Sequence, residues 1–110
     1  MNIQIFGKSK CFDTKKAERW FKERRIKYQY IDLQKYGMSA GELRSVKGVV
    51  GLETLIDNDA PGSEMLKYLA YDEDRLGKLF EEQNLLRTPI VRNGKKAAVG
   101  YCPDVWVTWD

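Results

Sequence analysis

The chain has 110 residues, of which 43% are hydrophobic and 32% charged, and a formal net charge of +3 at neutral pH. This length suits one domain, and the composition excludes a disordered or fibrous chain. Histidine is absent, and the two cysteines, Cys11 and Cys102, lie far apart in the sequence. The sequence therefore excludes catalysis that depends on histidine, and it predicts neither a disulfide-rich secreted domain nor a metal site.

Hydropathy and charge indicate the expected location of the protein and the kind of ligand it favours. No apolar run is long enough to cross a bilayer, and the first residues lack the apolar core of a secretion signal, so we expect a cytoplasmic protein without membrane contact. Bases outnumber acids in residues 8–25, whereas acids outnumber bases in residues 39–84. The basic segment favours an anionic ligand but is too sparse for direct nucleic-acid binding. Ordinary solvated helix faces would give the same pattern.

The first third of the chain predicts a strand, a helix and a second strand. Residues 2–6 alternate polar and apolar side chains, which is typical of a short strand. From about residue 13 to residue 25, apolar side chains repeat at helical spacing, with Asp13 or Thr14 near the N-cap. Residues 28–33 are rich in β-forming side chains. Such a unit places its two strands parallel in one sheet.

The middle third, about residues 39–84, is predicted to be a helical insert. Ser39 and Glu42 have the spacing of a capping box, so a short helix begins there and ends at the glycines near residue 50. Further helices are expected over residues 63–71 and 72–84. The predicted apolar face of the last helix consists of Leu76, Leu79 and Phe80.

The last third predicts two antiparallel strands. Residues 89–92 and 95–99 flank Asn93-Gly94, a strong hairpin signal because both central residues of a type I′ turn need positive φ. Pro103 favours a terminal helix. A βαβ unit, a helical insert, a ββ hairpin and a terminal helix around a central mixed sheet of four strands make up a thioredoxin-like α/β fold. We expect a single domain over residues 1–110.

Cys11 lies between the first predicted strand and the first predicted helix. Unpaired backbone N–H groups and the positive end of the helix dipole favour a thiolate there, and a thiolate is the nucleophilic form. The nearest lysines in the sequence are Lys8, Lys10, Lys15 and Lys16. An inert packing cysteine is the alternative. The second cysteine of a redox dithiol motif would stand three residues on, where this chain has Thr14.

Segments at both ends of the chain resemble the ArsC/Spx family of arsenate-reductase-like proteins. Residues 11–17, followed by Trp20-Phe21, resemble the family's active-site loop and first helix. Residues 86–91 and 99–101 resemble its later strands, and the resemblance covers the whole chain. It implies a thiol-dependent oxidoreductase with Cys11 as nucleophile, and glutathione as co-substrate or a glutaredoxin or other protein thiol as partner. Independently of the resemblance, we expect Lys8, Lys10, Lys15 and Thr14, which lie around Cys11 in the sequence, to stabilise the thiolate. The sequence has no nucleotide, metal or flavin motif, so we expect no bound cofactor.

The same resemblance gives roles to residues near the end of the chain. Thr88-Pro89 resembles the cis-proline that faces the catalytic loop, where the Thr88 backbone would bind glutathione or an extended peptide beside Arg87. A trans proline that opens an edge strand is the alternative. Cys102 is either a resolving thiol, which needs its Cα within about 7 Å of that of Cys11, or a packing cysteine.

The chain departs from the family at the residues that bind arsenate. The family places oxyanion-binding arginines immediately before the proline, after the hairpin and in the insert. This chain has Thr88, Cys102 and the acidic stretch 57–59 at those places. We therefore expect an oxidoreductase that is not an arsenate reductase. The second hypothesis is a Spx-like regulatory module that contacts RNA polymerase or another protein.

Overall fold

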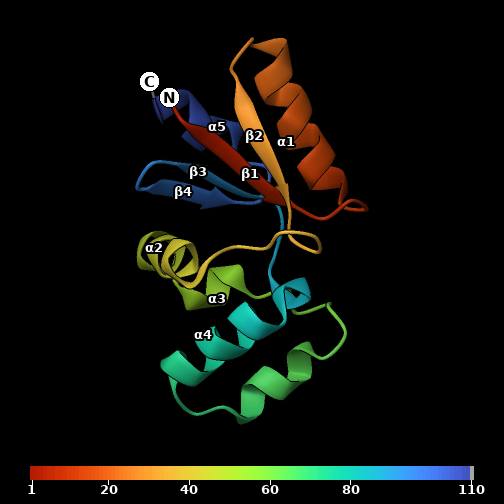
Figure 1. Cartoon of the computed structure of the whole chain (residues 1–110), viewed down its shortest axis with the longest axis vertical. Coiled ribbons are helices and arrows are strands. Elements are labelled where there is room, and N and C mark those ends of the chain that lie inside the picture. Colours follow the sequence, from red (N-terminus) through yellow and green to blue (C-terminus); the bar gives the residue numbers. More distant parts are fainter. Residues whose placement is uncertain (110) are drawn as a thin grey trace.

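A four-stranded mixed sheet forms the centre of the protein (Figure 1). The computed structural model describes residues 1–109. The strands are β1 (Ile3–Gly7), β2 (Tyr28–Asp32), β3 (Ile90–Asn93) and β4 (Lys96–Val99), in the spatial order β2-β1-β3-β4. β1 and β2 are parallel, and the other neighbouring pairs are antiparallel. The predicted mixed sheet of a thioredoxin-like α/β fold is confirmed.

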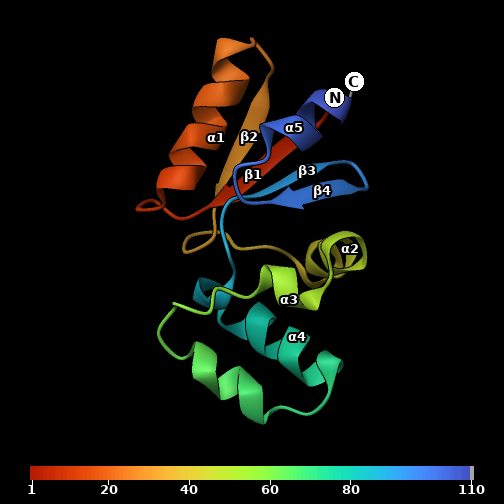
Figure 2. The ribbon, with the colours of Figure 1, turned by 180° about the vertical axis from the view of Figure 1, so that it is seen from behind.

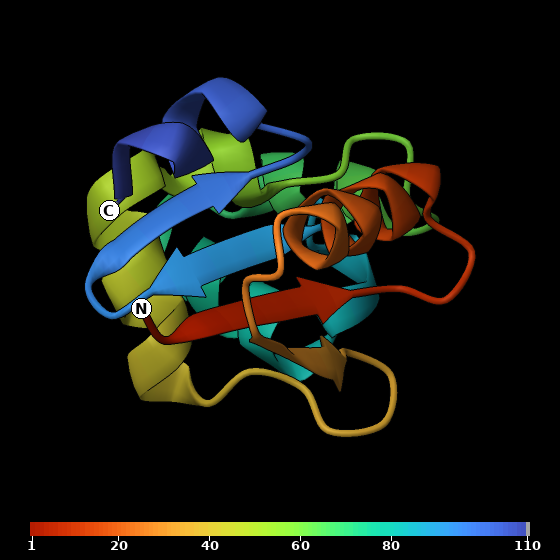
Figure 3. The same ribbon diagram turned by 90° about the horizontal axis from the view of Figure 1, so that it is seen from above.

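Two helices cover one face of this sheet (Figures 2 and 3). They are α1 (Phe12–Glu23) and α5 (Pro103–Trp106), and a short 3₁₀ helix, η3 (Val107–Trp109), follows α5. The terminal helix predicted after Pro103 is therefore present as two short pieces. The buried side chains on this face are Ile3, Ile5, Ala17, Trp20, Phe21, Val91, Ala98, Trp106 and Trp109. Alternate residues of each strand point to one face, so one apolar set is buried here.

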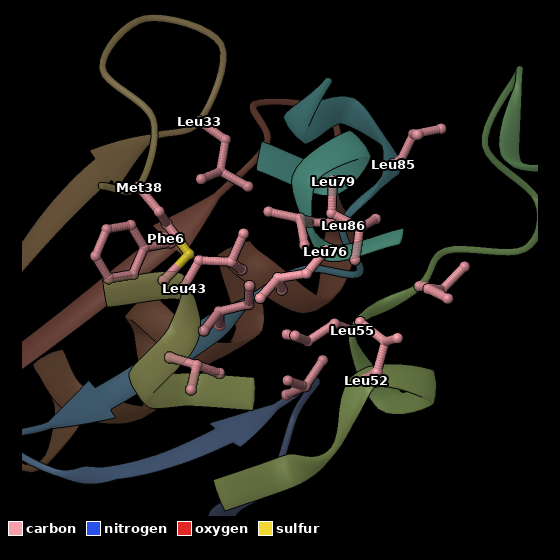
Figure 4. Close-up of a cluster of buried hydrophobic side chains, with 14 of the residues drawn as sticks. Phe6, Leu33, Met38, Leu43, Leu52, Leu55, Leu76, Leu79, Leu85 and Leu86 are labelled. Carbon is pink, nitrogen blue, oxygen red and sulfur yellow. The ribbon is translucent and has the colours of Figure 1, made fainter. Parts of the chain in front are cut away.

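The helical insert packs against the opposite face. It consists of α2 (Ala40–Val50), α3 (Leu52–Leu55), η1 (Ser63–Tyr68), α4 (Asp72–Glu81) and η2 (Gln83–Leu85). Its leucines gather around Phe6 of β1 and Met38, as Figure 4 shows. None of the helices within residues 1–109 combines the length and apolar character that a membrane span needs.

The predicted start of α2 is confirmed in detail. Ser39 Oγ accepts a hydrogen bond from the Glu42 N–H at 3.1 Å, and the Glu42 carboxylate accepts one from the Ser39 N–H at 2.9 Å. The helix ends at Gly51, whose φ of 85 suits a glycine. Two backbone donors at the start of α2 are thereby satisfied.

The other insert helices differ from their prediction. The helix expected over residues 63–71 is a 3₁₀ helix that ends at Tyr68. Its buried residues, Ser63 and Leu66, are three apart, which matches the three-residue turn of that helix. Phe80, assigned to the apolar face of α4, is 42% exposed, and the buried side chains of α4 are Leu76 and Leu79.

The hairpin is present, but its turn is one residue later than predicted. Asn93 pairs with Lys96, so Gly94 and Lys95 are the central residues. Gly94 has a φ of 62, and Lys95 is not among the residues with positive φ. A glycine with positive φ at the first central position is typical of a type II′ turn, so the predicted type I′ turn was wrong.

Replacing Ser39 with alanine should lower the free energy of unfolding by about 1 kcal/mol, because the N-terminus of α2 loses its capping oxygen. Ser39→Asp is the matched control and should keep wild-type stability, since aspartate caps equally well. Urea denaturation of the three proteins measures the difference. Equal stability of Ser39→Ala and Ser39→Asp would contradict the capping role.

Candidate active site

Cys11 is the N-cap residue of α1. Its backbone is extended (φ −87, ψ 117), its N–H donates to the Lys8 carbonyl at 3.1 Å, and its carbonyl accepts from the Lys15 N–H at 3.3 Å. The helix therefore begins at Phe12, and its N-cap is Cys11, which precedes Asp13 and Thr14, the residues expected near the N-cap. As N-cap, the half-buried Cys11 side chain lies beside the unpaired N–H groups of the first helical turn.

Hydrogen-bond donors hold the pKa of Cys11 below its ordinary value. Burial of the thiol is the largest influence and would raise the pKa. The side chains of Thr14 and Thr88, and the backbone N–H groups of Thr14 and Asp13, together outweigh it. In the protonated state the thiol donates to the Thr88 carbonyl, 3.5 Å away. The site therefore favours the thiolate, the nucleophilic form of cysteine.

Thr14 is positioned by the close approach of α1 to the end of β1. Its side chain is 1% exposed, and its hydroxyl makes no conventional hydrogen bond within residues 1–109. A Cβ added at Gly7 would lie 2.3 Å from Thr14 Cγ2 and 3.0 Å from Tyr30 Cε1, so only glycine fits there. A buried hydroxyl without another partner is available to donate to the Cys11 thiolate.

The Thr88-Pro89 peptide bond is cis, as the resemblance implied. Arg87, the residue before Thr88, is tied to the insert, since its N–H donates to the Leu55 carbonyl at 2.8 Å. The Thr88 carbonyl faces Cys11, whereas the Thr88 N–H makes no hydrogen bond with any described residue. The segment therefore presents a free backbone donor next to the thiol.

The side chain of Lys8 binds the insert. Its ammonium group donates to the Asn84 carbonyl at 2.7 Å and lies 3.6 Å from the Asp57 carboxylate. Lys8 thus ties the loop that carries Cys11 to the insert. Its predicted role at the thiolate stays a prediction.

The other lysines are exposed around the start of α1. Lys16 lies over the ring of Tyr101, 4.8 Å from its centroid. The groups that lower the pKa of Cys11 include no lysine. The roles predicted for Lys10 and Lys15 stay predictions.

Cys102 lies at the same end of the sheet, as the N-cap residue of α5. Its thiol donates to the Val99 carbonyl at 3.3 Å, and its side chain packs against the core beneath α1. Burial and the Asp104 and Asp13 carboxylates raise the pKa of Cys102, and Arg87 opposes them. The influence of Asp13 shows that Cys102 lies near the start of α1. Both cysteines are free thiols, and their pairing stays a prediction.

The chain matches the model of a known protein family over most of its length. The family model described as the ArsC family matches residues 6–108. The chain belongs to the ArsC family. The global transcriptional regulator Spx 2 of Oceanobacillus iheyensis is 32% identical over 110 residues, which cover 94% of this chain and 80% of that protein.

Solved structures share the ArsC-family fold. An ArsC family related protein from Bacteroides fragilis superposes with a TM-score of 0.86 at 19% identity, covering 100% of this chain and 98% of that one. An arsenate reductase from Vibrio cholerae superposes with a TM-score of 0.84 at 19% identity, covering 98% and 97%. At these identities the likeness shows the fold alone.

Three exposed aromatic side chains around the start of α1 were missed by sequence reasoning. Tyr30 is 36% exposed, and a thiolate at Cys11 is among the charges that, after burial, raise its pKa. Phe12 is 80% exposed directly after the thiol, and Tyr101 is 38% exposed. Gly7, the last residue of β1, was the one sign of this in the sequence, since a residue without a side chain leaves room for the Tyr30 ring.

Within residues 1–109 no group of metal-ligating side chains gathers.

Replacing Thr14 with alanine should raise the pKa of Cys11 by about one pH unit, because the thiolate loses a buried donor. Thr14→Ser keeps the hydroxyl and should leave the pKa near its wild-type value. The measurement is the pH dependence of alkylation at Cys11, followed by mass spectrometry of the modified peptide. Coincident curves for the two variants would mean that the hydroxyl does not act on the thiolate.

Replacing Lys8 with methionine should lower the free energy of unfolding by about 1 kcal/mol, because the insert loses a charged donor to Asn84 and Asp57. The pKa of Cys11 should stay the same. Lys10→Met, at an exposed site, should leave stability unchanged. A raised Cys11 pKa in Lys8→Met would instead support the thiolate-stabilising role expected from the sequence.

Proposed function

We propose that this protein is a thiol-dependent oxidoreductase in which Cys11 is the nucleophile. Membership of the ArsC family and similarity to a Spx regulator support two function classes, a thiol-oxidoreductase-like protein and a Spx-like regulator. The observation that carries the first is the set of donors around Cys11, which reverses the effect of burial on its pKa. A cysteine kept only for packing needs no such donors.

The proposed reaction is thiol–disulfide exchange with glutathione, or with a glutaredoxin or other protein thiol. The Cys11 thiolate attacks one sulfur of a disulfide, a new disulfide forms, and the second sulfur leaves as a thiolate. A glutathione or glutaredoxin thiolate then attacks the mixed disulfide and releases Cys11 as a thiolate. No bound cofactor is needed for either step.

Arg87 and Thr88 are the proposed ligand-binding residues. The free Thr88 N–H would pair with the main chain of glutathione or of an extended peptide. The exposed Arg87 side chain extends over Gly100, where an added Cβ would lie 3.9 Å from Arg87 Nη2. Its guanidinium is suited to a glutathione carboxylate. Lys10 and Lys15, both exposed, would add long-range attraction for an anion.

We propose that arsenate is not the substrate. By the family resemblance, Thr88 and Cys102 stand where arginines would bind the oxyanion. A neutral hydroxyl or thiol cannot give the bidentate, charged hydrogen bonds of a guanidinium. Arg87 is next to Thr88 in an extended segment, so their side chains point in opposite directions and Arg87 is an imperfect substitute.

Cys102 has two open roles in this proposal. As a resolving thiol it would attack the Cys11 mixed disulfide, form an internal disulfide and release the partner thiol. Its raised pKa lowers the thiolate fraction available for that attack. Its packing against the core favours the alternative, a packing cysteine.

The second candidate function is a Spx-like regulator that acts in the cytoplasm by contacting RNA polymerase or another protein. It is favoured by the 32% identity to a global transcriptional regulator over 94% of this chain. Such a role tolerates an unreactive thiol. Thr14 replaces the second cysteine of a dithiol switch, which counts against redox switching and not against binding.

Oxidised glutathione added to the reduced protein should form one mixed disulfide per chain at Cys11, and glutaredoxin with reduced glutathione should remove it. Cys11→Ser should form no adduct at position 11. Cys102→Ser should form the Cys11 adduct at the wild-type rate, and an adduct that persists longer than in the wild type would assign Cys102 the resolving role. Intact mass and peptide mapping give the site and the rate. Arsenate supplied with glutathione and glutaredoxin should yield no arsenite.

Two results would overturn this proposal. If the Cys11 adduct forms no faster than an adduct at an ordinary exposed thiol, the Spx-like regulator becomes the favoured function. Production of arsenite that depends on Cys11 would restore arsenate as the substrate.

A further inference from the structure

A surface groove runs between α1 and β2, on the free edge of the sheet. Its volume is about 600 Å³, and its lining includes Lys22, Arg25, Lys27, Tyr28 and Tyr30. β2 is the end strand of the sheet and pairs only with β1, and in Figure 1 it lies beside α1. We call this region the edge groove.

The open edge of β2 carries unpaired backbone groups. The Leu33 N–H donates to the Gly7 carbonyl, and successive residues of a parallel strand direct their N–H and C=O groups to alternate sides. Tyr28 and Tyr30 therefore direct theirs away from β1. No hydrogen bond from any described residue reaches those groups on that side. Such an edge can accept one further strand.

The charges around this edge are mostly positive and unpaired. Within residues 1–109, no ion pair involves Lys22, Arg25 or Lys27. The one acid of the groove, Glu18, accepts a hydrogen bond from the Tyr28 hydroxyl at 3.0 Å. The edge groove thus offers three free cations beside a row of strand donors and acceptors.

Arg25 is an unusual residue for its backbone position. The Ile26 N–H donates to the Phe21 carbonyl at 2.9 Å, and the Arg25 N–H to the Lys22 carbonyl at 3.0 Å, which is the Schellman arrangement at a helix end. Its left-handed residue is normally glycine, but here it is Arg25, with a φ of 58. No other non-glycine residue within 1–109 has positive φ. An arginine at this unfavourable position indicates that its side chain serves the groove.

We propose that the edge groove binds an extended acidic peptide segment of another protein, which joins the sheet as a strand beside β2. The free backbone groups of Tyr28 and Tyr30 supply the pairing, and Lys22, Arg25 and Lys27 select the acidic side chains. A second copy of this chain would bring like charges together at the edge. This site goes beyond the proposed function and does not depend on the reactivity of Cys11.

The first test uses a short synthetic peptide that alternates glutamate with valine, titrated into the isotope-labelled full chain. The Tyr28 and Tyr30 amide signals should shift, and a peptide with lysine in place of glutamate should not bind. Two N-methylated versions of the acidic peptide have the same charge but carry the methyl groups on opposite sets of alternate residues. Each version blocks the N–H groups along only one edge of the peptide strand, so the pair separates strand pairing from charge. One version should lose at least about tenfold in affinity and the other should not.

The second test uses variants of the edge groove. Arg25→Gly should weaken peptide binding while raising the midpoint of thermal unfolding by a few degrees, because glycine suits the left-handed position. Lys22→Gln with Lys27→Gln should weaken binding by about tenfold. Lys95→Gln with Lys96→Gln, at the distant hairpin, removes the same charge and should leave affinity unchanged.

Three results would overturn the proposal. One is failure of the acidic peptide to bind, or equal affinity of both N-methylated versions. Another is an Arg25→Gly protein that binds as well as the wild type. The third is occupation of the Tyr28–Tyr30 edge by a second copy of the chain or by a single-stranded oligonucleotide in preference to the peptide.

Discussion

The close approach of α1 to the last residue of β1 is the constraint on which the site depends. Gly7 has no side chain, so Thr14 packs against the strand and α1 begins directly after Cys11. The first-turn N–H groups and the buried Thr14 hydroxyl are thereby directed at the sulfur. The groups that lower the pKa of Cys11 are short-range donors fixed in the backbone packing. Such donors act without the movement of long, mobile side chains.

The insert supports this site from the other face of the sheet. Its Leu55 carbonyl holds the Arg87 N–H, which fixes the segment before the cis-proline. Its Asp57 carboxylate and Asn84 carbonyl hold Lys8, which fixes the loop before Cys11. The two segments that meet at the thiol are therefore each tied to the insert. A change that weakens the packing of the insert should therefore alter the geometry around the Cys11 thiol, although the groups that shift the pKa of Cys11 include no side chain of the insert.

The fold was predictable where the signals are local. The capping box of α2, the alternation in β1 and the hairpin needed only neighbours in sequence, and each was found within a residue or two. The site was predictable only in part. The contacts of Lys8 with the Asn84 carbonyl and the Asp57 carboxylate join residues far apart in the sequence, so they could not be predicted from its neighbours. The role of Tyr30 depends on the parallel pairing of β2 with β1, and that of Thr14 on the absence of a side chain at Gly7. The periodicity of apolar residues along the sequence contains no information about these contacts between distant segments.

The most direct test of this account is the salt dependence of the Cys11 pKa, measured from thiolate absorbance in the Cys102→Ser protein. Hydrogen bonds from buried donors are hardly screened, whereas attraction by exposed lysines is largely lost at about 1 M salt. If buried donors stabilise the thiolate, the pKa of Cys11 lies below about 8.5 at low salt and stays there at high salt. A pKa that rises to about 8.5 or above as salt is added would contradict it, and would return the stabilisation of the thiolate to the lysines around α1.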